Sequence, residues 1–198
     1  MTVFELIFSL YSLLFGLALA QVFAGFGNTL QERRKIKVGW LTPLLGLFVT
    51  FDTTSFWEIA WEMRVVDMSR PYFLYLICGV LLAGIYYLAA RLVFPRDFVE
   101  WPDFDVYYFQ HKQWVFGGLL LCNLIAAAAL LTVSSEWRRF VGGPLGGLNE
   151  ASYFILLIAL MAARTKRANI VLLILMLARY AVFPLLIFLT VAIYGHRL

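Results

Sequence analysis

The sequence predicts an all-α membrane protein, a polytopic bundle of transmembrane helices in which residues 1–198 form one integral membrane domain. Three observations lead to this fold class. Hydrophobic residues make up 63% of the chain and charged residues 14%, whereas soluble domains average about 45–50% apolar and about 25% charged residues. The apolar residues fall in long blocks, and about 20 such residues let a helix cross a bilayer core. The blocks lack the polar–apolar alternation of a membrane β-barrel, so the spans are predicted to be helices.

Six apolar segments are each predicted to span the membrane once. They are residues 3–27, 40–62, 72–94, 113–133, 149–163 and 170–194. The first segment contains Ala18-Leu19-Ala20, which fits a signal-peptide cleavage site. The residues before this motif include Glu5 and no Lys or Arg, whereas a signal peptide begins with basic residues. We therefore expect the first segment to be retained as a helix.

The first two spans carry recognisable helix features. In the first, Gly16, Ala20 and Ala24 form a stripe of small residues that lets a neighbouring helix approach closely, and we expect it to pack within the monomer. In the second, Pro43 lies in the first turn, where its missing N–H costs little. Trp61 lies at the far end of this span, where indole rings favour the headgroup level.

The later spans are less regular. The third is followed by a polar loop, residues 95–112, in which acids are interleaved with aromatic residues and two prolines argue against one long helix. We expect this loop to lie at the membrane interface. A Gly-rich segment, residues 134–147, follows the fourth span and is predicted to be irregular. The fifth span is the shortest, and the sixth is interrupted by Arg179 and Pro184.

Basic residues indicate the orientation of the bundle. The loops after the first, third and fifth spans hold about twice as many Lys and Arg residues as the other side, and short cytoplasmic loops carry such an excess. The densest cluster is Arg33, Arg34, Lys35 and Lys37, after the first span. Both termini are therefore predicted to lie on the non-cytoplasmic side of a bacterial inner (plasma) membrane.

A polar layer is predicted near the middle of the membrane. Asp52 lies in the centre of the second span, where a carboxylate costs roughly 2.5–3.5 kcal/mol on insertion scales. The predicted topology brings polar residues of four other spans to a similar depth: Gln21, Tyr86, Tyr87, Asn123 and Arg179. We expect Asp52 and Arg179 to form an ion pair, with Asn123 and Gln21 supplying hydrogen bonds. Such a pair either holds the helices in register or forms a ligand or ion site.

A second group of acids is expected near the non-cytoplasmic face. It comprises Glu5, Glu58 and Glu62, with His196 close by. This group fits either a vestibule that attracts cations or ordinary charge at the membrane interface.

Most catalytic and cofactor sites lack their motifs in this sequence. The two histidines, His111 and His196, are predicted on opposite sides of the membrane, so one subunit cannot supply a bis-His haem site or a di-iron centre. There is no HExxH, GxSxG, Walker or GxGxxG motif. We therefore expect no catalytic residues, no metal and no cofactor. The net charge of +4 comes from short clusters beside apolar blocks, so we expect no nucleic-acid partner.

The opening ELIFSLYSLLFGLALAQVFAGFGNTLQERR, followed by a Trp-rich second span, resembles a group of small uncharacterised bacterial multi-pass membrane proteins. This resemblance implies a membrane helix bundle and brings no activity with it.

Two functions remain open on this evidence. The first is a small transporter or channel-like protein, acting as an oligomer, with the layer of Asp52 and Arg179 as its pathway or gate. The second is a non-catalytic accessory or sensor subunit of a larger membrane complex, in which residues 95–112 dock a partner and the polar layer is only structural. A lipid-active enzyme is less favoured. The expected partners are the lipid bilayer and either further copies of the chain or other subunits.

Overall fold

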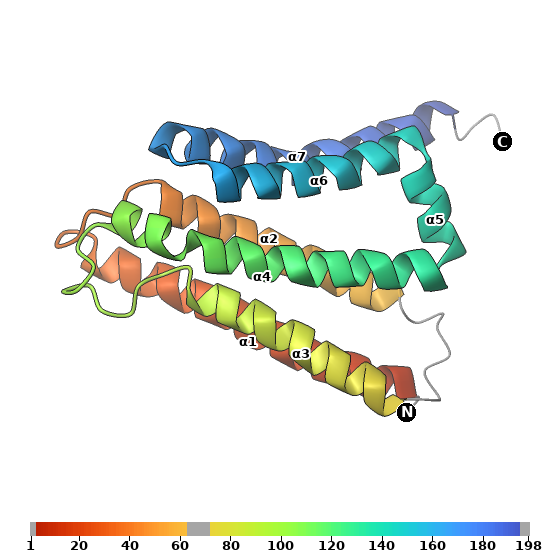
Figure 1. The fold of residues 1–198 in the computed structure, drawn as a ribbon, viewed down its shortest axis with the longest axis horizontal. Helices are drawn as coiled ribbons and strands as arrows, with labels where there is room; N and C mark the ends of the chain where they lie inside the picture. The colour runs from red at the N-terminus through yellow and green to blue at the C-terminus, as the bar shows by residue number, and fades with distance from the viewer. Residues whose placement is uncertain (1–2, 63–71, 195–198) are drawn as a thin grey trace.

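The computed structural model describes residues 3–62 and 72–194, and these residues form seven helices and no sheet (Figure 1). The helices are α1 (Val3–Glu32), α2 (Leu41–Glu62), α3 (Tyr72–Arg91), α4 (Phe104–Val133), α5 (Ser135–Gly142), α6 (Pro144–Ala162) and α7 (Lys166–Tyr194). The predicted all-α fold class is confirmed.

The long helices are stacked as three pairs (Figure 1). α1 packs beside α3, α2 beside α4, and α6 beside α7. The middle pair contacts both outer pairs, since α2 packs against α1 and α7, and α4 packs against α3 and α6. A side chain in the middle of α2 therefore lies near the centre of the bundle.

The connections gather at two ends of the bundle. The α1–α2, α3–α4 and α6–α7 connections lie together at what we call the loop end, on the left of Figure 1. The start of α1, the end of α7 and the short helix α5 lie at the opposite end, here called the α5 end. The first and last helices therefore begin and end on the same side of the bundle.

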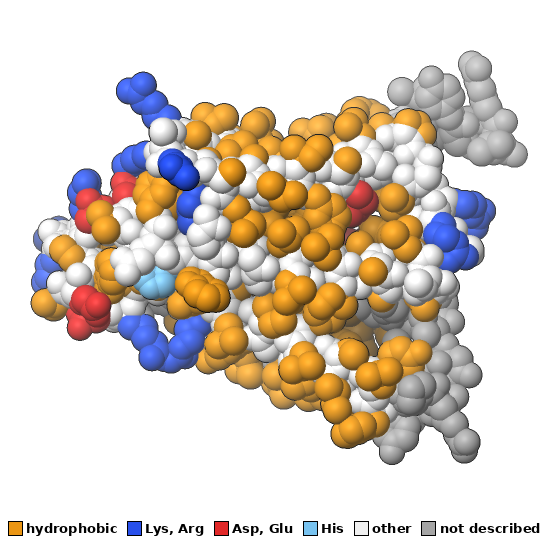
Figure 2. All heavy atoms as spheres, in the orientation of Figure 1, with side chains coloured by type: hydrophobic (Ala, Val, Ile, Leu, Met, Phe, Trp, Pro, Cys, Tyr) orange, Lys and Arg blue, Asp and Glu red, His pale blue; other side chains and the backbone are white. Residues whose placement is uncertain are grey.

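Five helices of the described chain are long and apolar enough to cross a membrane. They are α1, α3, α4, α6 and α7, and the prediction of six spans is not confirmed. α2 is not among the five because Asp52, Glu58 and a run of hydroxyl residues lower its hydropathy. Hydrophobic side chains cover the middle of the molecule and Lys and Arg gather at its two ends, as expected of a membrane protein (Figure 2).

Several predicted boundaries were wrong. α4 begins at Phe104 instead of residue 113, because Asp103 caps its N-terminus by accepting a hydrogen bond from the Asp105 amide at 2.9 Å. Residues 134–147 are not irregular: α5 and the start of α6 occupy them, with Pro144 in the first turn of α6. The small-residue stripe of α1 does not pack within the monomer as predicted, since Ala20 and Ala24 are exposed.

The α1–α2 and α3–α4 connections are joined by hydrogen bonds at the loop end. Lys37 donates its backbone N–H to the carbonyl of Pro102 at 2.8 Å, and its carbonyl accepts from Phe104 at 3.1 Å. The side chains of Lys37 and Asp103 form an ion pair at 2.5 Å. The hydrogen bond from Lys37 lowers the pKa of Asp103 below its ordinary 3.8, so the contribution of this pair is present above pH 3.8 and is lost as the pH falls through the lowered pKa.

Lys112, expected in a cytoplasmic loop, is instead buried inside the bundle at the C-terminus of α6. Its ammonium donates to the carbonyl of Leu160 at 2.7 Å, to that of Ala163, and to Oδ1 of Asn169 at 3.1 Å. The same amide oxygen accepts from the Tyr108 hydroxyl at 2.9 Å. A cation placed on unpaired carbonyls at a helix C-terminus is favourable, and this one holds the α6–α7 turn against α4.

Candidate functional site

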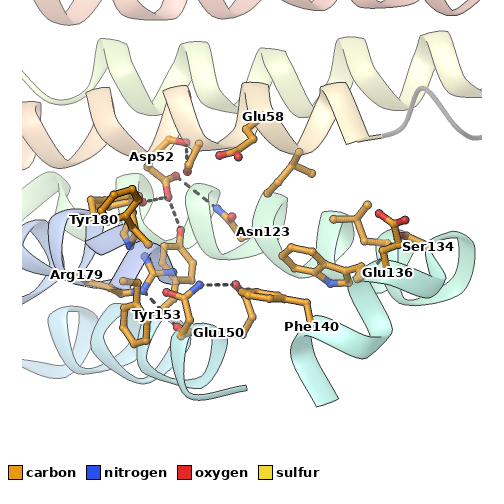
Figure 3. A pocket seen from close by; sticks show the side chains of 18 residues that line it. Asp52, Glu58, Asn123, Ser134, Glu136, Phe140, Glu150, Tyr153, Arg179 and Tyr180 are labelled. Carbon is orange, nitrogen blue, oxygen red and sulfur yellow. Dashed lines mark hydrogen bonds between the residues drawn. The ribbon is translucent and has the colours of Figure 1, made fainter. Parts of the chain in front are cut away.

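Asp52 is the polar centre of the bundle. Only 1% of it is exposed, and four donors converge on its carboxylate; Asn123, Tyr153 and Tyr180 are seen in Figure 3. The hydroxyls of Tyr153 and Tyr180 donate to Oδ1 at 2.8 and 2.9 Å. The hydroxyl of Tyr86 and the amide of Asn123 donate to Oδ2 at 2.8 and 3.4 Å. We call Asp52 and these four donors the carboxylate network.

Each donor of the carboxylate network comes from a different helix. Tyr86 lies on α3, Asn123 on α4, Tyr153 on α6 and Tyr180 on α7, so the network ties α2 to four neighbours. A carboxylate offers about four lone-pair sites, and the four donors match this capacity. Fixed dipoles in a low-dielectric interior therefore offset much of the cost of burying this group.

Arg179 does not form the expected ion pair. No nitrogen of Arg179 lies within 4.0 Å of the Asp52 carboxylate in the described chain. Its Nε donates to the carbonyl of Asn149 at 3.2 Å, and its guanidinium lies 4.9 Å from the ring centroid of Tyr153 and 5.2 Å from that of Tyr180. The reason is helical geometry, because consecutive residues of α7 point in directions about 100° apart. Tyr180 takes the direction toward Asp52, and Arg179 turns toward α6.

The other residues predicted for the polar layer divide in the same way. Tyr86 and Asn123 belong to the carboxylate network. Tyr87, one residue further along α3, points elsewhere, and its hydroxyl accepts from Arg91 at 3.2 Å. Gln21 is half-buried on α1 and makes no hydrogen bond to Asp52. α1 contributes a ring to this region instead of a polar group, since Phe15 packs edge-on against Tyr86.

Two members of the network, Tyr153 and Tyr180, were absent from the sequence-based prediction. The signal that could have found them is their position, because tyrosines in membrane helices are enriched at the interfaces and both of these lie inside spans. Tyr180 also adjoins Arg179, so it shares the depth already assigned to that residue.

A cavity of about 780 Å³ lies beside the network, between α2, α4, α5, α6 and α7. This volume falls within the roughly 300–1,000 Å³ of typical small-molecule sites. The charged residues that line it are Asp52, Glu58, Glu136, Glu150 and Arg179 (Figure 3). Asn123 and Tyr180 line it as well, so the cavity reaches the carboxylate network.

Helix α5 forms one wall of the cavity with Trp137 and Phe140. Ser134 caps this helix by accepting a hydrogen bond from the amide of Trp137 at 3.1 Å. Gly146 allows α6 to approach α5, because a Cβ there would lie 2.0 Å from the carbonyl oxygen of Phe140. The wall is therefore fixed by backbone contacts to its neighbour.

Only part of the predicted outer acidic group lies within the described residues, so its assembly stays a prediction. Glu58 lines the cavity, and Glu5 lies in the first turn of α1. The side chain of Glu62 and all of His196 lie outside the described residues. Glu58 shares the cavity with Glu136 and Glu150, acids that the prediction did not include. Within residues 3–62 and 72–194, no group of three or more His, Cys, Asp or Glu side chains is arranged to hold a metal ion.

No protein-family model, curated protein or solved structure matches this chain. The resemblance to small bacterial multi-pass proteins stays an expectation, and the function is argued from the geometry of the carboxylate network and its cavity.

Proposed function

We propose that this protein is a small transporter or channel-like membrane protein that admits a solute to the cavity beside Asp52. The observation that carries the proposal is the cavity itself, about 780 Å³ in volume and lined by charged groups within a hydrophobic bundle. Charged side chains in membrane helices are costly, and they are characteristic of ion and solute pathways. A polar network that only held helices in register would be served as well by a closed core.

The topology proposed for this function has six spans, with α2 as the sixth crossing. α2 is long enough to cross, and it runs from the loop end to the α5 end among other helices (Figure 1). Asp52 is met by donors of four neighbouring helices, and the hydroxyls of Thr50, Thr53 and Thr54 donate to carbonyls within α2. These polar groups are therefore satisfied without the apolar surface of a lipid-facing span. The basic loop end is assigned to the cytoplasm of a bacterial cell, and both termini to the outside of its inner membrane.

In this orientation the cavity lies in the non-cytoplasmic half of the bundle, since α5 forms one of its walls. Its inner limit is the carboxylate network. Tyr86 is buried in the packed core, whereas Tyr153, Tyr180 and Asn123 line the cavity, and of these three Tyr180 and Asn123 are partly exposed. A solute would therefore meet Tyr180 and Asn123 first.

Pro184 provides a place where this limit can move. It lies inside α7 and lines the cavity, and it has no N–H to donate to the carbonyl of Tyr180 one turn earlier. Helices bend most readily at such positions. Bending α7 there would draw Tyr180 away from Asp52 and open the network from the cavity side.

The test uses cysteine accessibility and solute flux together. In a background with Cys78→Ala and Cys122→Ala, Ser55→Cys places a thiol in the cavity lining, and Thr54→Cys places one on an exposed face of α2 outside it. A membrane-impermeant thiol reagent applied from the non-cytoplasmic side should label the first and not the second. Liposomes that contain the protein should swell in a panel of small solutes, and labelling Ser55→Cys should block the swelling.

Two outcomes would overturn the proposal. One is equal labelling of the two thiols, which would show that the cavity gives position 55 no access to water that position 54 lacks. The other is swelling at the rate of empty liposomes for every solute, before and after labelling.

The accessory-subunit hypothesis has less support. It placed a partner on the aromatic residues of the loop, but Phe104 is 0% and Tyr107 6% exposed. Trp101 packs edge-on against Tyr107 and His111. These rings are used within the chain, so the loop offers little aromatic surface to a partner.

A further inference from the structure

We infer that the solute taken by this cavity is an organic cation with a flat apolar body. The inference rests on the proposed function and names its substrate class. Four carboxylates and one guanidinium line the cavity, so the charge it presents is negative when all five are ionised. In the low-dielectric surroundings of a helix bundle such a charge is screened less than it would be in water.

The one base is already engaged. The guanidinium of Arg179 lies against the rings of Tyr153 and Tyr180, and its Nε is bound to the carbonyl of Asn149. Glu150 lies close enough to interact electrostatically with Arg179, and it accepts a hydrogen bond from the Asn149 amide at 3.1 Å. At this side of the cavity the negative charge of Glu150 therefore offsets the positive charge of Arg179.

Two acids on the opposite side are not balanced. Glu58 on α2 and Glu136 on α5 are exposed and line the cavity, and neither has an ion-pair or hydrogen-bond partner among the described residues. Figure 3 shows them on different helices, around the same hollow. They offer a diffuse negative field that suits a bulky monovalent cation. A compact metal ion needs ligands gathered at a single point, and no such cluster occurs in the described part of the chain.

The aromatic side chains in the cavity walls are the reason to expect a solute with an apolar body. Trp137 and Phe140 of α5 face the cavity, and Phe183 and Phe188 of α7 line it as well. Aromatic faces attract organic cations, and Trp does so most strongly. An anion of the same shape would meet the same rings and four carboxylates, with Arg179 already bound elsewhere. The cavity therefore distinguishes charge more than shape.

The experiment compares three ligands of similar size and different charge: phenyltrimethylammonium, its neutral isostere tert-butylbenzene, and benzenesulfonate. Binding to the full-length protein is measured by calorimetry in dodecyl maltoside, a detergent without charge or ammonium groups, and the heats of empty micelles are subtracted. We expect the cation to bind most tightly. Glu58→Gln and Glu136→Gln should each weaken it about two- to fivefold, the range of an exposed ion pair. The matched control, Glu100→Gln at the loop end, should bind like the wild type.

A lipid headgroup could supply the same ammonium chemistry as a free solute. Adding phosphatidylethanolamine to the micelles separates the two sources: unchanged cation affinity supports a free solute, and competition by the lipid supports the ammonium class with the lipid as its carrier.

The inference is overturned if benzenesulfonate or tert-butylbenzene binds as tightly as the cation. It is also overturned if the double variant Glu58→Gln and Glu136→Gln keeps full affinity. Liposomes that swell without preference for charge would contradict this inference and leave the proposed function standing. Cation binding without any swelling would support this inference and contradict the proposed function.

Discussion

Replacing Asp52 shows whether its carboxylate is stabilised by hydrogen bonds from the four donors or by an ion pair with Arg179. In Asp52→Ala the four donors of the carboxylate network lose their common acceptor. Tyr86 and Tyr153 are 0% and 4% exposed, so their buried O–H groups lose their acceptor. A buried donor left unpaired costs about 1–3 kcal/mol, and two of them give about 2–6 kcal/mol. We expect the lower part of that range, because interhelical hydrogen bonds in membranes average only about 0.6 kcal/mol.

Asp52→Asn should behave differently. The amide oxygen can take the place of Oδ2 and accept from Tyr86 and Asn123. The NH₂ group can take the place of Oδ1 and donate to the hydroxyl oxygens of Tyr153 and Tyr180, because a tyrosine hydroxyl also accepts. Each neighbour keeps one hydrogen bond to this side chain, but the O–H groups of Tyr153 and Tyr180 lose their acceptor, so the free energy of unfolding should fall by less than in Asp52→Ala.

An Asp52–Arg179 ion pair would give the opposite result. Removing one partner of a buried pair leaves the other charge uncompensated and costs about 3–5 kcal/mol, so Asp52→Asn would then be strongly destabilising. In this structure Arg179 is bound to a backbone carbonyl and two aromatic rings, so it does not depend on Asp52.

The assay is unfolding of purified protein in mixed micelles with a rising fraction of sodium dodecyl sulfate, followed by circular dichroism. Thr54→Ala, at an exposed position of the same helix, is the control and should change the free energy of unfolding by less than about 0.5 kcal/mol. Equal stability of Asp52→Ala and Asp52→Asn would refute the reasoning about donors. Equal, strong loss in both would show that charge, and not hydrogen bonding, stabilises the centre.

Three further predictions concern the rest of the fold. Lys112→Met keeps the length of the side chain and removes the donor to two carbonyls at the C-terminus of α6 and to the Asn169 amide oxygen of α7, so the same titration should show a loss of about 1–3 kcal/mol; wild-type stability would contradict the role given to this ammonium. Asp103→Ala removes the N-cap of α4 and should cost about 0.5–2 kcal/mol. Asp103→Asn keeps the cap and loses only the pair with Lys37, so it should be milder, and its difference from the wild type should vanish as the pH falls below 3.8; a difference that persists in acid would count against the pair. Gly146→Ala places a methyl group 2.0 Å from a carbonyl oxygen of α5 and should displace that helix, which thiol labelling at Ser55→Cys would report as altered access, whereas Gly117→Ala finds only a methyl carbon at 4.0 Å and should be tolerated.

Much of the secondary structure could be predicted from local sequence. Pro95 and Pro102 lie outside helices, as expected of residues that cannot continue one. The predicted spans each correspond to a helix, because apolar length is a property of a continuous stretch of residues. α5 was missed, since eight residues between a Ser and a Gly-Pro pair look like a loop when only hydropathy is considered. Its cap at Ser134 was the available signal.

Only part of the carboxylate network could be predicted from the sequence. The depth of a residue along a span follows from counting residues, so Asp52, Tyr86 and Asn123 could be placed at one level. The direction in which a side chain points follows from the rotation of its helix, and one residue changes that direction by about 100°. Gln21 and Tyr87 share the level and do not reach Asp52, while Tyr153 and Tyr180 do.

The sequence by itself determined that this chain forms apolar helices, that a carboxylate lies deep among them, and that polar groups of other helices share its depth. All three follow from composition and from counting along the chain. Only the tertiary structure decided that tyrosine hydroxyls instead of a guanidinium meet that carboxylate, that α5 closes one side of a cavity, and that Glu58 and Glu136 share it. These features depend on how each helix is rotated and which helices are neighbours, and both are set by the packing of the whole bundle.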